Sequence, residues 1–109
     1  MTLAVGTPYP SATYEYATPE HGGSSLYVTI AKRNGDVWVD AIVGKAGSVI
    51  IADAEAIAAL AGIALRHGAP PIKVALALKG ITHDQTNKLS FDVLSVADGI
   101  GDALWQELC

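Results

Sequence analysis

Residues 26–43, LYVTIAKRNGDVWVDAIV, carry the local signal that decides the fold. Apolar residues alternate with other residues on both sides of Asn34-Gly35, which is the pattern of two half-buried strands. The Asn-Gly pair favours a type I′ turn, because both central residues take φ > 0 and the turn matches the twist of the strands it joins. The stretch therefore predicts an antiparallel β-hairpin.

Two further strands are expected outside the hairpin. Thr13 to Ala17 alternates and is rich in β-forming residues, and Leu89 to Leu94 alternates near the C-terminus. Proline and glycine are frequent before the hairpin, so residues 1–12 are expected to be flexible or irregular. We therefore expect a small antiparallel sheet of about four strands, with the Asn-Gly hairpin at its centre.

The remaining segments have helical patterns. Ile50 to Arg66 is rich in Ala and Leu, and a second helix from Ile72 to Leu78 follows after a proline pair. Ser95 begins a final helix, since Ser95 and Asp98 have the spacing of a capping box. The predicted fold class is α+β: one domain over residues 1–109, whose sheet is packed by two consecutive helices and a C-terminal helix.

The helix from Ile50 to Arg66 is apolar around most of its circumference, which is typical of a helix buried on more than one side. Half of all residues are hydrophobic and only 17% are charged. A chain of this composition has more apolar surface than one small core can bury. We therefore expect a homo-oligomer, at least a dimer, with this helix at the subunit interface.

Composition excludes several classes of function. The formal net charge of −4 argues against a nucleic-acid polymer as partner. The single cysteine, Cys109, and three scattered histidines predict no metal site and no cofactor. The longest apolar run, Ala56 to Leu65, is shorter than the roughly 20 residues that span a bilayer, and the N-terminus lacks a signal-peptide pattern. The expected location is cytoplasmic, with no membrane partner.

The loop GKAGS, residues 44–48, joins the hairpin to the first helix. Its glycines are explained if the chain simply turns a tight corner there. Alternatively, Lys45, Gly47 and Ser48 hold a phosphate or another anion at the start of the helix. The spacing is not that of a Walker loop, so any anion binding would be of the general helix-terminus kind.

Two other polar groups are candidate ligand contacts. Arg66 either complements the C-terminal carbonyls of its helix or faces a ligand from a neighbouring subunit. Thr82, His83 and Asp84 lie in a polar loop that is either a solvated connection or a binding loop. No nucleophile accompanies His83 and Asp84, so the sequence predicts no enzyme. Trp38 either packs against a second surface or offers a platform for a base.

The order of these elements resembles the TSCPD domain family, which occurs in adenosylcobalamin-dependent ribonucleotide reductases and as short stand-alone proteins, some of them from phages. The match covers about Tyr14 to Leu108. Four stretches carry it: Leu26 to Ile30, Gly44 to Ser48, Ala64 to Gly68 and Leu78 to Ile81. The Thr-Ser-Cys-Pro-Asp segment that names the family corresponds to Leu94-Ser95-Val96-Ala97-Asp98, which keeps the serine and aspartate and lacks the cysteine and proline.

This resemblance implies an accessory domain and not the reductase itself, since the chain has no room for its barrel, cobalamin site or cysteine pair. A second resemblance, in element order alone, is to small phage proteins that defeat the Thoeris defence by acting as sponges for a nucleotide-derived signal. It implies a non-catalytic, oligomeric module that sequesters a cyclic nucleotide or cyclic ADP-ribose. The alternative is a protein-interaction or accessory domain without a small-molecule ligand.

Overall fold

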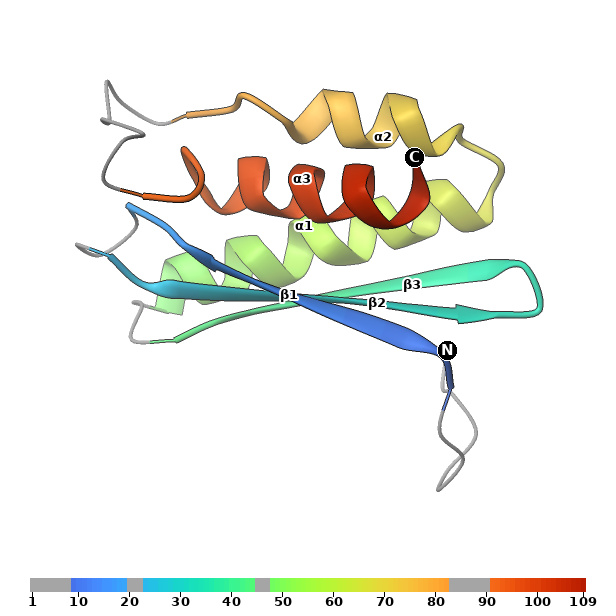
Figure 1. Cartoon of the computed structure of the whole chain (residues 1–109), viewed down its shortest axis with the longest axis horizontal. Coiled ribbons are helices and arrows are strands. Elements are labelled where there is room, and N and C mark those ends of the chain that lie inside the picture. The colour runs from blue at the N-terminus through green and yellow to red at the C-terminus, as the bar shows by residue number, and fades with distance from the viewer. Residues whose placement is uncertain (1–8, 20–22, 45–47, 83–90) are drawn as a thin grey trace.

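A computed structural model shows a three-stranded antiparallel sheet in the part of the chain that it describes, residues 9–19, 23–44, 48–82 and 91–109. Its strands are β1 (Ser11–Ala17), β2 (Ser25–Arg33) and β3 (Asp36–Val43), in the order β1-β2-β3 (Figure 1). β1 begins two residues before the expected Thr13. The central strand β2 pairs with both neighbours along its length.

The predicted hairpin is confirmed. Arg33 pairs with Asp36 in the antiparallel register, and the two residues between them have φ of 50° at Asn34 and 84° at Gly35. A left-handed backbone at both central positions is what a type I′ turn requires. The turn therefore sets the register in which Leu26, Val28 and Ile30 pair with Val43, Ala41 and Val39 on one face of the sheet.

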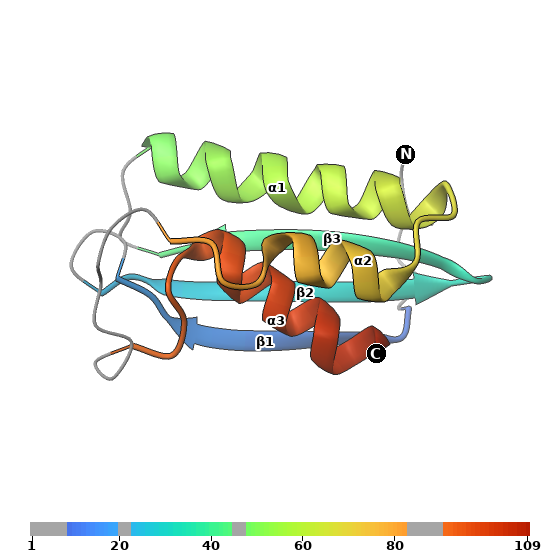
Figure 2. The same cartoon turned by 90° about the horizontal axis from the view of Figure 1, so that it is seen from above.

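Three helices cover that face. They are α1 (Ser48–Arg66), α2 (Pro71–Leu78) and α3 (Val96–Leu108). α1 lies along the β3 side of the sheet and α3 crosses the other strands, while α2 lies over α3 on the side away from the sheet (Figures 1 and 2). The described chain therefore has the α+β architecture that the sequence predicts.

The core lies between the sheet and these helices. Leu26, Val28 and Ile30 of β2 and Ile100 and Leu104 of α3 are fully buried. α1 contributes only small side chains to the buried set, namely Ala54, Ala58 and Ala61. Small residues let the helix backbone approach the sheet closely, and they leave the longer aliphatic side chains of α1 elsewhere on its surface.

A glycine determines how closely α2 approaches α3. A Cβ added at Gly101 would lie 2.8 Å from the backbone nitrogen of Lys79 and 2.9 Å from the carbonyl oxygen of Ala75. Both atoms belong to the last turn of α2 and its cap, so they cannot move aside as a side chain would. Glycine is unfavourable inside a helix, and here the contact with α2 explains its presence.

The prediction of a fourth strand at Leu89 to Leu94 is wrong for residues 91–94, the part of this segment that the structure describes. Residues 91–95 form consecutive bends, and residues 89 and 90 lie outside the described chain. The backbone nitrogen of Asp92 donates to the oxygen of Ala17, and the Asp92 carboxylate accepts from the nitrogen of Ala17, at 3.0 and 2.7 Å. The segment therefore bonds to the last residue of β1 through Asp92 alone and does not add a strand to the sheet.

None of the described helices combines the length and the apolar character that a membrane-spanning helix needs.

Candidate functional site

A groove lies at the end of the molecule where α1 and α3 begin. Its volume is about 260 Å³. α1 supplies one wall, and the start of α3 with the chain that follows α2 supplies the other; the lining residues are Ile50, Asp53, Ile57, Ile81, Thr82, Ser95, Val96 and Ala97. We call this the end groove.

The lining of the end groove combines an apolar wall with few polar groups. Ile50, Ile57, Ile81 and Val96 are aliphatic, while Asp53 provides a carboxylate. The groove also adjoins the first turns of two helices, whose N-terminal ends carry partial positive charge from the helix dipole. This mixture of apolar surface and a few polar groups is typical of sites for small organic ligands.

Ser95 fixes the start of α3. Its hydroxyl accepts a hydrogen bond from the backbone nitrogen of Asp98 at 3.1 Å and donates to the carbonyl oxygen of Ile81 at 2.6 Å. The first bond is the N-cap interaction that the sequence predicts. The second ties the cap to the chain that leaves α2, so one side chain positions both halves of this groove wall.

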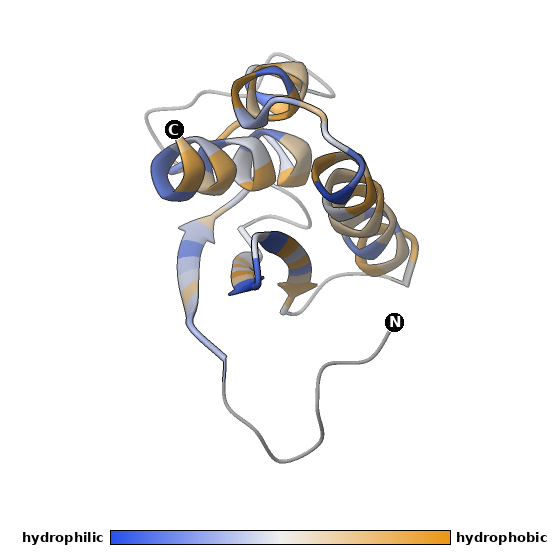
Figure 3. Cartoon of the chain, turned by 90° about the vertical axis from the view of Figure 1, so that its right-hand side faces the viewer, coloured by the Kyte–Doolittle hydropathy of each residue, from blue (hydrophilic) through white to orange (hydrophobic). Residues whose placement is uncertain are grey.

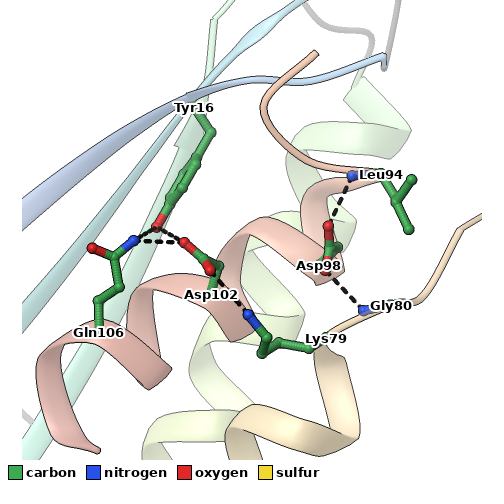
Figure 4. Close-up of polar contacts among 7 residues, drawn as sticks. All are labelled: Tyr16, Lys79, Gly80, Leu94, Asp98, Asp102 and Gln106. Atoms are coloured by element: carbon green, nitrogen blue, oxygen red, sulfur yellow. Dashed lines mark hydrogen bonds and ion pairs between the residues drawn. The ribbon is translucent and has the colours of Figure 1, made fainter. Parts of the chain in front are cut away.

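Asp98 acts differently from the glutamate of a standard capping box. Its side chain is 5% exposed, and its two oxygens accept from the backbone nitrogens of Leu94 and Gly80, each at 2.8 Å (Figure 4). A capping box would return to the nitrogen of Ser95. The carboxylate instead joins the end of α2 to the start of α3 with two charge-assisted hydrogen bonds.

One turn further along α3, Asp102 is the centre of a second polar cluster. It accepts from the hydroxyl of Tyr16 at 2.8 Å, from the amide of Gln106 at 2.7 Å and from the ammonium of Lys79 at 3.0 Å (Figure 4). These partners come from β1, α3 and the C-terminal cap of α2. The cluster therefore cross-links three parts of the fold and lies outside the lining of the end groove.

These contacts change the acidity of both partners. Burial and the hydrogen bond to Asp102 raise the pKa of Tyr16 well above its ordinary value of 10.0. Burial opposes ionisation of Asp102, but the hydrogen bonds from Lys79, Gln106 and Tyr16 outweigh it and hold its pKa below 3.8. At neutral pH the cluster is a carboxylate held by a cation and two neutral donors, which is a structural arrangement and not an acid–base pair.

The residues predicted to bind a ligand do not all lie together in one copy of the chain. Thr82 lines the end groove, and Ser48 is the first residue of α1, whose third residue, Ile50, lines the same groove. Arg66 is the last residue of α1, so a helix of 19 residues, about 27 Å from end to end, separates it from Ser48. Thr82 and Arg66 of the same copy therefore cannot contact one small ligand.

The other predicted residues, Lys45, Gly47, His83 and Asp84, lie outside the described chain.

Arg66 has local partners at its own end of the molecule. Its guanidinium lies 3.7 Å from the centroid of the Trp38 ring and donates to the carbonyl oxygen of Val37 at 2.8 Å. Trp38 therefore makes a cation–π contact with the last residue of α1 in the same chain. Because β3 is an edge strand, the bond to Val37 also occupies one of the backbone groups that the edge would otherwise present.

Sequence reasoning did not single out Asp53 or Asp102. The signal for Asp102 was present, since Asp98, Asp102 and Gln106 recur every four residues and share one face of a helix. Asp53 carried no such signal, because its place in the groove depends on how α1 meets α3. Within the described chain, no three His, Cys, Asp or Glu side chains are grouped as metal ligands.

A small antiparallel sheet with three helices on one face and an apolar end groove define a small α+β domain with a candidate binding site. Comparison with family models identifies the family of this domain, since the model of the TSCPD domain matches residues 7–108. The chain belongs to the TSCPD domain family, whose members are small accessory domains associated with ribonucleotide reductases. No curated protein and no solved structure gives a match to the chain.

Proposed function

We propose that this TSCPD domain is a non-catalytic binding module that sequesters a nucleotide-derived small molecule, and that the ligand docks in the end groove. One observation carries the proposal: Thr82 and the first turns of α1 and α3 line the same groove. The two segments predicted independently to bind a ligand, residues 44–48 and 82–84, therefore either contain or closely precede a residue that lines this groove.

The chemistry of the end groove matches the parts of a nucleotide. The aliphatic wall suits a base, and the two helix starts favour a phosphate group. The Asp53 carboxylate accepts hydrogen bonds from sugar hydroxyls or an exocyclic amine. The volume of about 260 Å³ lies just below the range of ligand pockets, roughly 300 to 1,000 Å³, so a cyclic dinucleotide or cyclic ADP-ribose would fill it and extend outward.

Release of a bound molecule tests this function directly. The purified protein is denatured, and the released fraction is searched by mass spectrometry for nucleotide-derived compounds. Thermal shifts are then measured with cyclic dinucleotides, cyclic trinucleotides and cyclic ADP-ribose isomers. A retained compound or a shift that saturates with ligand supports the proposal, and no compound together with no shift across the panel overturns it.

A matched pair of variants locates the site. Asp53→Asn removes the charge from the end groove, and Glu55→Gln makes the same change at an exposed position of α1 that does not line the groove. We expect Asp53→Asn to weaken ligand binding about tenfold, as loss of a charge-assisted hydrogen bond does, and Glu55→Gln to leave it unchanged. Equal effects of the two variants would place the ligand elsewhere.

A second candidate function is that of an accessory domain that binds a protein and no small molecule. It is favoured by large aliphatic side chains on the helical surface, of which Val49 and Leu60 are 71% and 66% exposed. Patches of this kind mark interaction surfaces. Co-elution with a purified ribonucleotide reductase from the same source, together with an empty ligand screen, would select this function.

A further inference from the structure

The side of α1 that faces away from the core carries a stripe of exposed aliphatic side chains: Val49, Ala52, Ala56, Ala59, Leu60 and Ile63. Each lies three or four residues from another member, which aligns them along one side of the helix. We call these six residues the α1 seam. Asp53 and Glu55 are also exposed, and they flank this stripe on either side.

This pattern differs from that of an ordinary surface helix. A helix with one buried face has polar residues on the other, whereas a helix that is apolar all round is covered on both sides. In Figure 3 the ribbon of α1 is coloured as hydrophobic along most of its length. Ala54, Ala58 and Ala61 already face the core, so the α1 seam is a second apolar face with nothing from the described chain covering it.

An apolar groove of about 370 Å³ continues the seam toward α2. Leu60 of the seam lines it together with Val74 and Ala77 of α2. The exposed apolar surface of α1 therefore runs onto the neighbouring helix, and a contiguous apolar surface of this kind marks an interface.

We propose that the α1 seam pairs with the same seam of a second copy, with the two α1 helices antiparallel and Ala56 at the two-fold axis. An isologous two-fold contact is the commonest way in which identical chains associate. With Ala56 at the axis, Val49 of one copy faces Ile63 of the other, and Ala52 faces Leu60. Leu60 then meets an alanine, Val49 and Ile63 pair at the two ends of the contact, and the alanines at the centre allow close contact.

The charges beside the seam favour the antiparallel arrangement. Both acidic residues of α1, Asp53 and Glu55, lie in its N-terminal half, and its last residue is Arg66. A parallel pair would place Asp53 of each copy beside the other Asp53, whereas the antiparallel pair places Asp53 opposite Ala59 of the other copy. Glu55, one residue from the axis, lies near its counterpart in both arrangements and does not distinguish them. Lys73 lines the groove beside Leu60 and Ala64, where it would lie near Asp53 of the other copy.

Light scattering after size exclusion tests the dimer with a matched pair of variants. The wild-type chain should elute at twice its 11.3 kDa mass at micromolar concentration. Leu60→Glu, at a position 66% exposed in the seam, should raise the dissociation constant about 100-fold or more, while Ile42→Glu, at a 60% exposed position of the sheet, should leave it unchanged. Far-UV circular dichroism confirms that both variants fold.

Crosslinking tests the direction of the helices in a Cys109→Ser background. Val49→Cys and Ile63→Cys chains, when mixed and oxidised, should form disulfide-linked heterodimers, and Val49→Cys alone should not. A crosslink between two Val49→Cys chains would overturn the antiparallel arrangement. A wild-type monomer, or a dimer that Leu60→Glu leaves intact, would overturn the interface.

The inference goes beyond the proposed function and fails separately from it. A monomer that still releases a nucleotide overturns the dimer alone. A dimer that releases none and shows no thermal shift overturns the ligand alone.

Discussion

The hydroxyl of Tyr16 donates to the carboxylate of Asp102 at 2.8 Å and so joins β1 to α3. Tyr16 is 7% exposed, and its ring packs in the core beside α3. Asp102 also receives the ammonium of Lys79, which adds the end of α2 to the same link. One carboxylate therefore connects the sheet to both of the C-terminal helices.

Stability should fall in acid because of Asp102. Its pKa is lower in the folded protein than in the unfolded chain, so its contribution is fully present above the ordinary value of 3.8 and is lost as the pH falls through the lower folded-state value. Glu107, held by Tyr14 and Lys32, also has a lowered pKa and acts in the same direction. Urea unfolding between pH 7 and pH 2 measures the loss.

Asp102→Asn measures how much of this acid-dependent loss of stability comes from Asp102 and its partners Tyr16 and Lys79. We expect it to lower the free energy of unfolding by about 1 to 2 kcal/mol at pH 7. The neutral side chain weakens the bond to Lys79, and its NH2 group replaces an oxygen that accepted a hydrogen bond. It should also flatten the acid dependence, and Glu107→Gln should do so less. If stability fell in acid as steeply in Asp102→Asn as in the wild-type protein, other carboxylates would be responsible for the acid dependence.

Gly101→Ala should destabilise the protein even though alanine is the better helix former. The added Cβ would lie 2.8 Å from the backbone nitrogen of Lys79, so α2 would have to shift outward. We expect a loss of about 1 to 3 kcal/mol, typical of overpacking, against a gain of up to about 1 kcal/mol from helix propensity. The measurement is the midpoint of urea unfolding.

Gly44→Ala is the control for this substitution. A Cβ at Gly44 would meet no atom nearer than the Ser25 oxygen at 4.0 Å, so its effect should remain within about 0.5 kcal/mol. If both alanine variants were equally stable, α2 would pack on α3 less closely than the structure shows.

The sequence predicted most of the fold because its elements have strong local signals. Asn34-Gly35 specifies the turn and therefore the register, and Ser95 specifies the start of α3 through a bond three residues away. The expected strand at Leu89 to Leu94 was wrong for residues 91–94, although alternation was present. Alternation indicates two faces of an extended chain, but whether the backbone pairs depends on its partners, here the distant Ala17 and the side chain of the nearby Asp98.

The candidate site was less predictable because it forms between elements. Thr82 and Ile50 lie 32 positions apart and line one groove only because α1 and α3 begin at the same end of the sheet. Arg66 was grouped with Thr82 by chemistry, yet α1 separates them by its full length. Residue type predicts which side chains suit a ligand, while the length and direction of helices decide which of them lie together.

Asp98→Asn should cost more stability than Ser95→Ala. The Asp98 carboxylate is buried and accepts from two backbone nitrogens, and an amide has only one oxygen to offer them. We expect a loss of about 2 to 3 kcal/mol for Asp98→Asn and about 1 to 2 kcal/mol for Ser95→Ala, which removes the N-cap bond and the bond to the Ile81 oxygen. Chemical denaturation provides both values.

Hydrogen exchange adds a local readout for Asp98. At least one of the backbone amides of Gly80 and Leu94 should exchange faster in Asp98→Asn than in Ser95→Ala, because only the first variant replaces one of their two acceptor oxygens. Protection of both amides that survives in Asp98→Asn would contradict the link between α2 and α3.

Arg66→Lys should weaken the attachment of α1 to β3, although the charge is kept. A guanidinium can stack on the Trp38 ring and donate in its own plane to the Val37 oxygen at once, whereas an ammonium lacks the flat face that stacking needs. We expect a loss of about 0.5 to 1.5 kcal/mol and a change in Trp38 fluorescence, measured in a Trp105→Phe background. Arg33→Lys, at a residue 5.0 Å from the Tyr9 ring, is the matched control and should be nearly neutral. Equal stability of the two lysine variants with unchanged Trp38 emission would mean that α1 holds the β3 edge by its alanine packing alone.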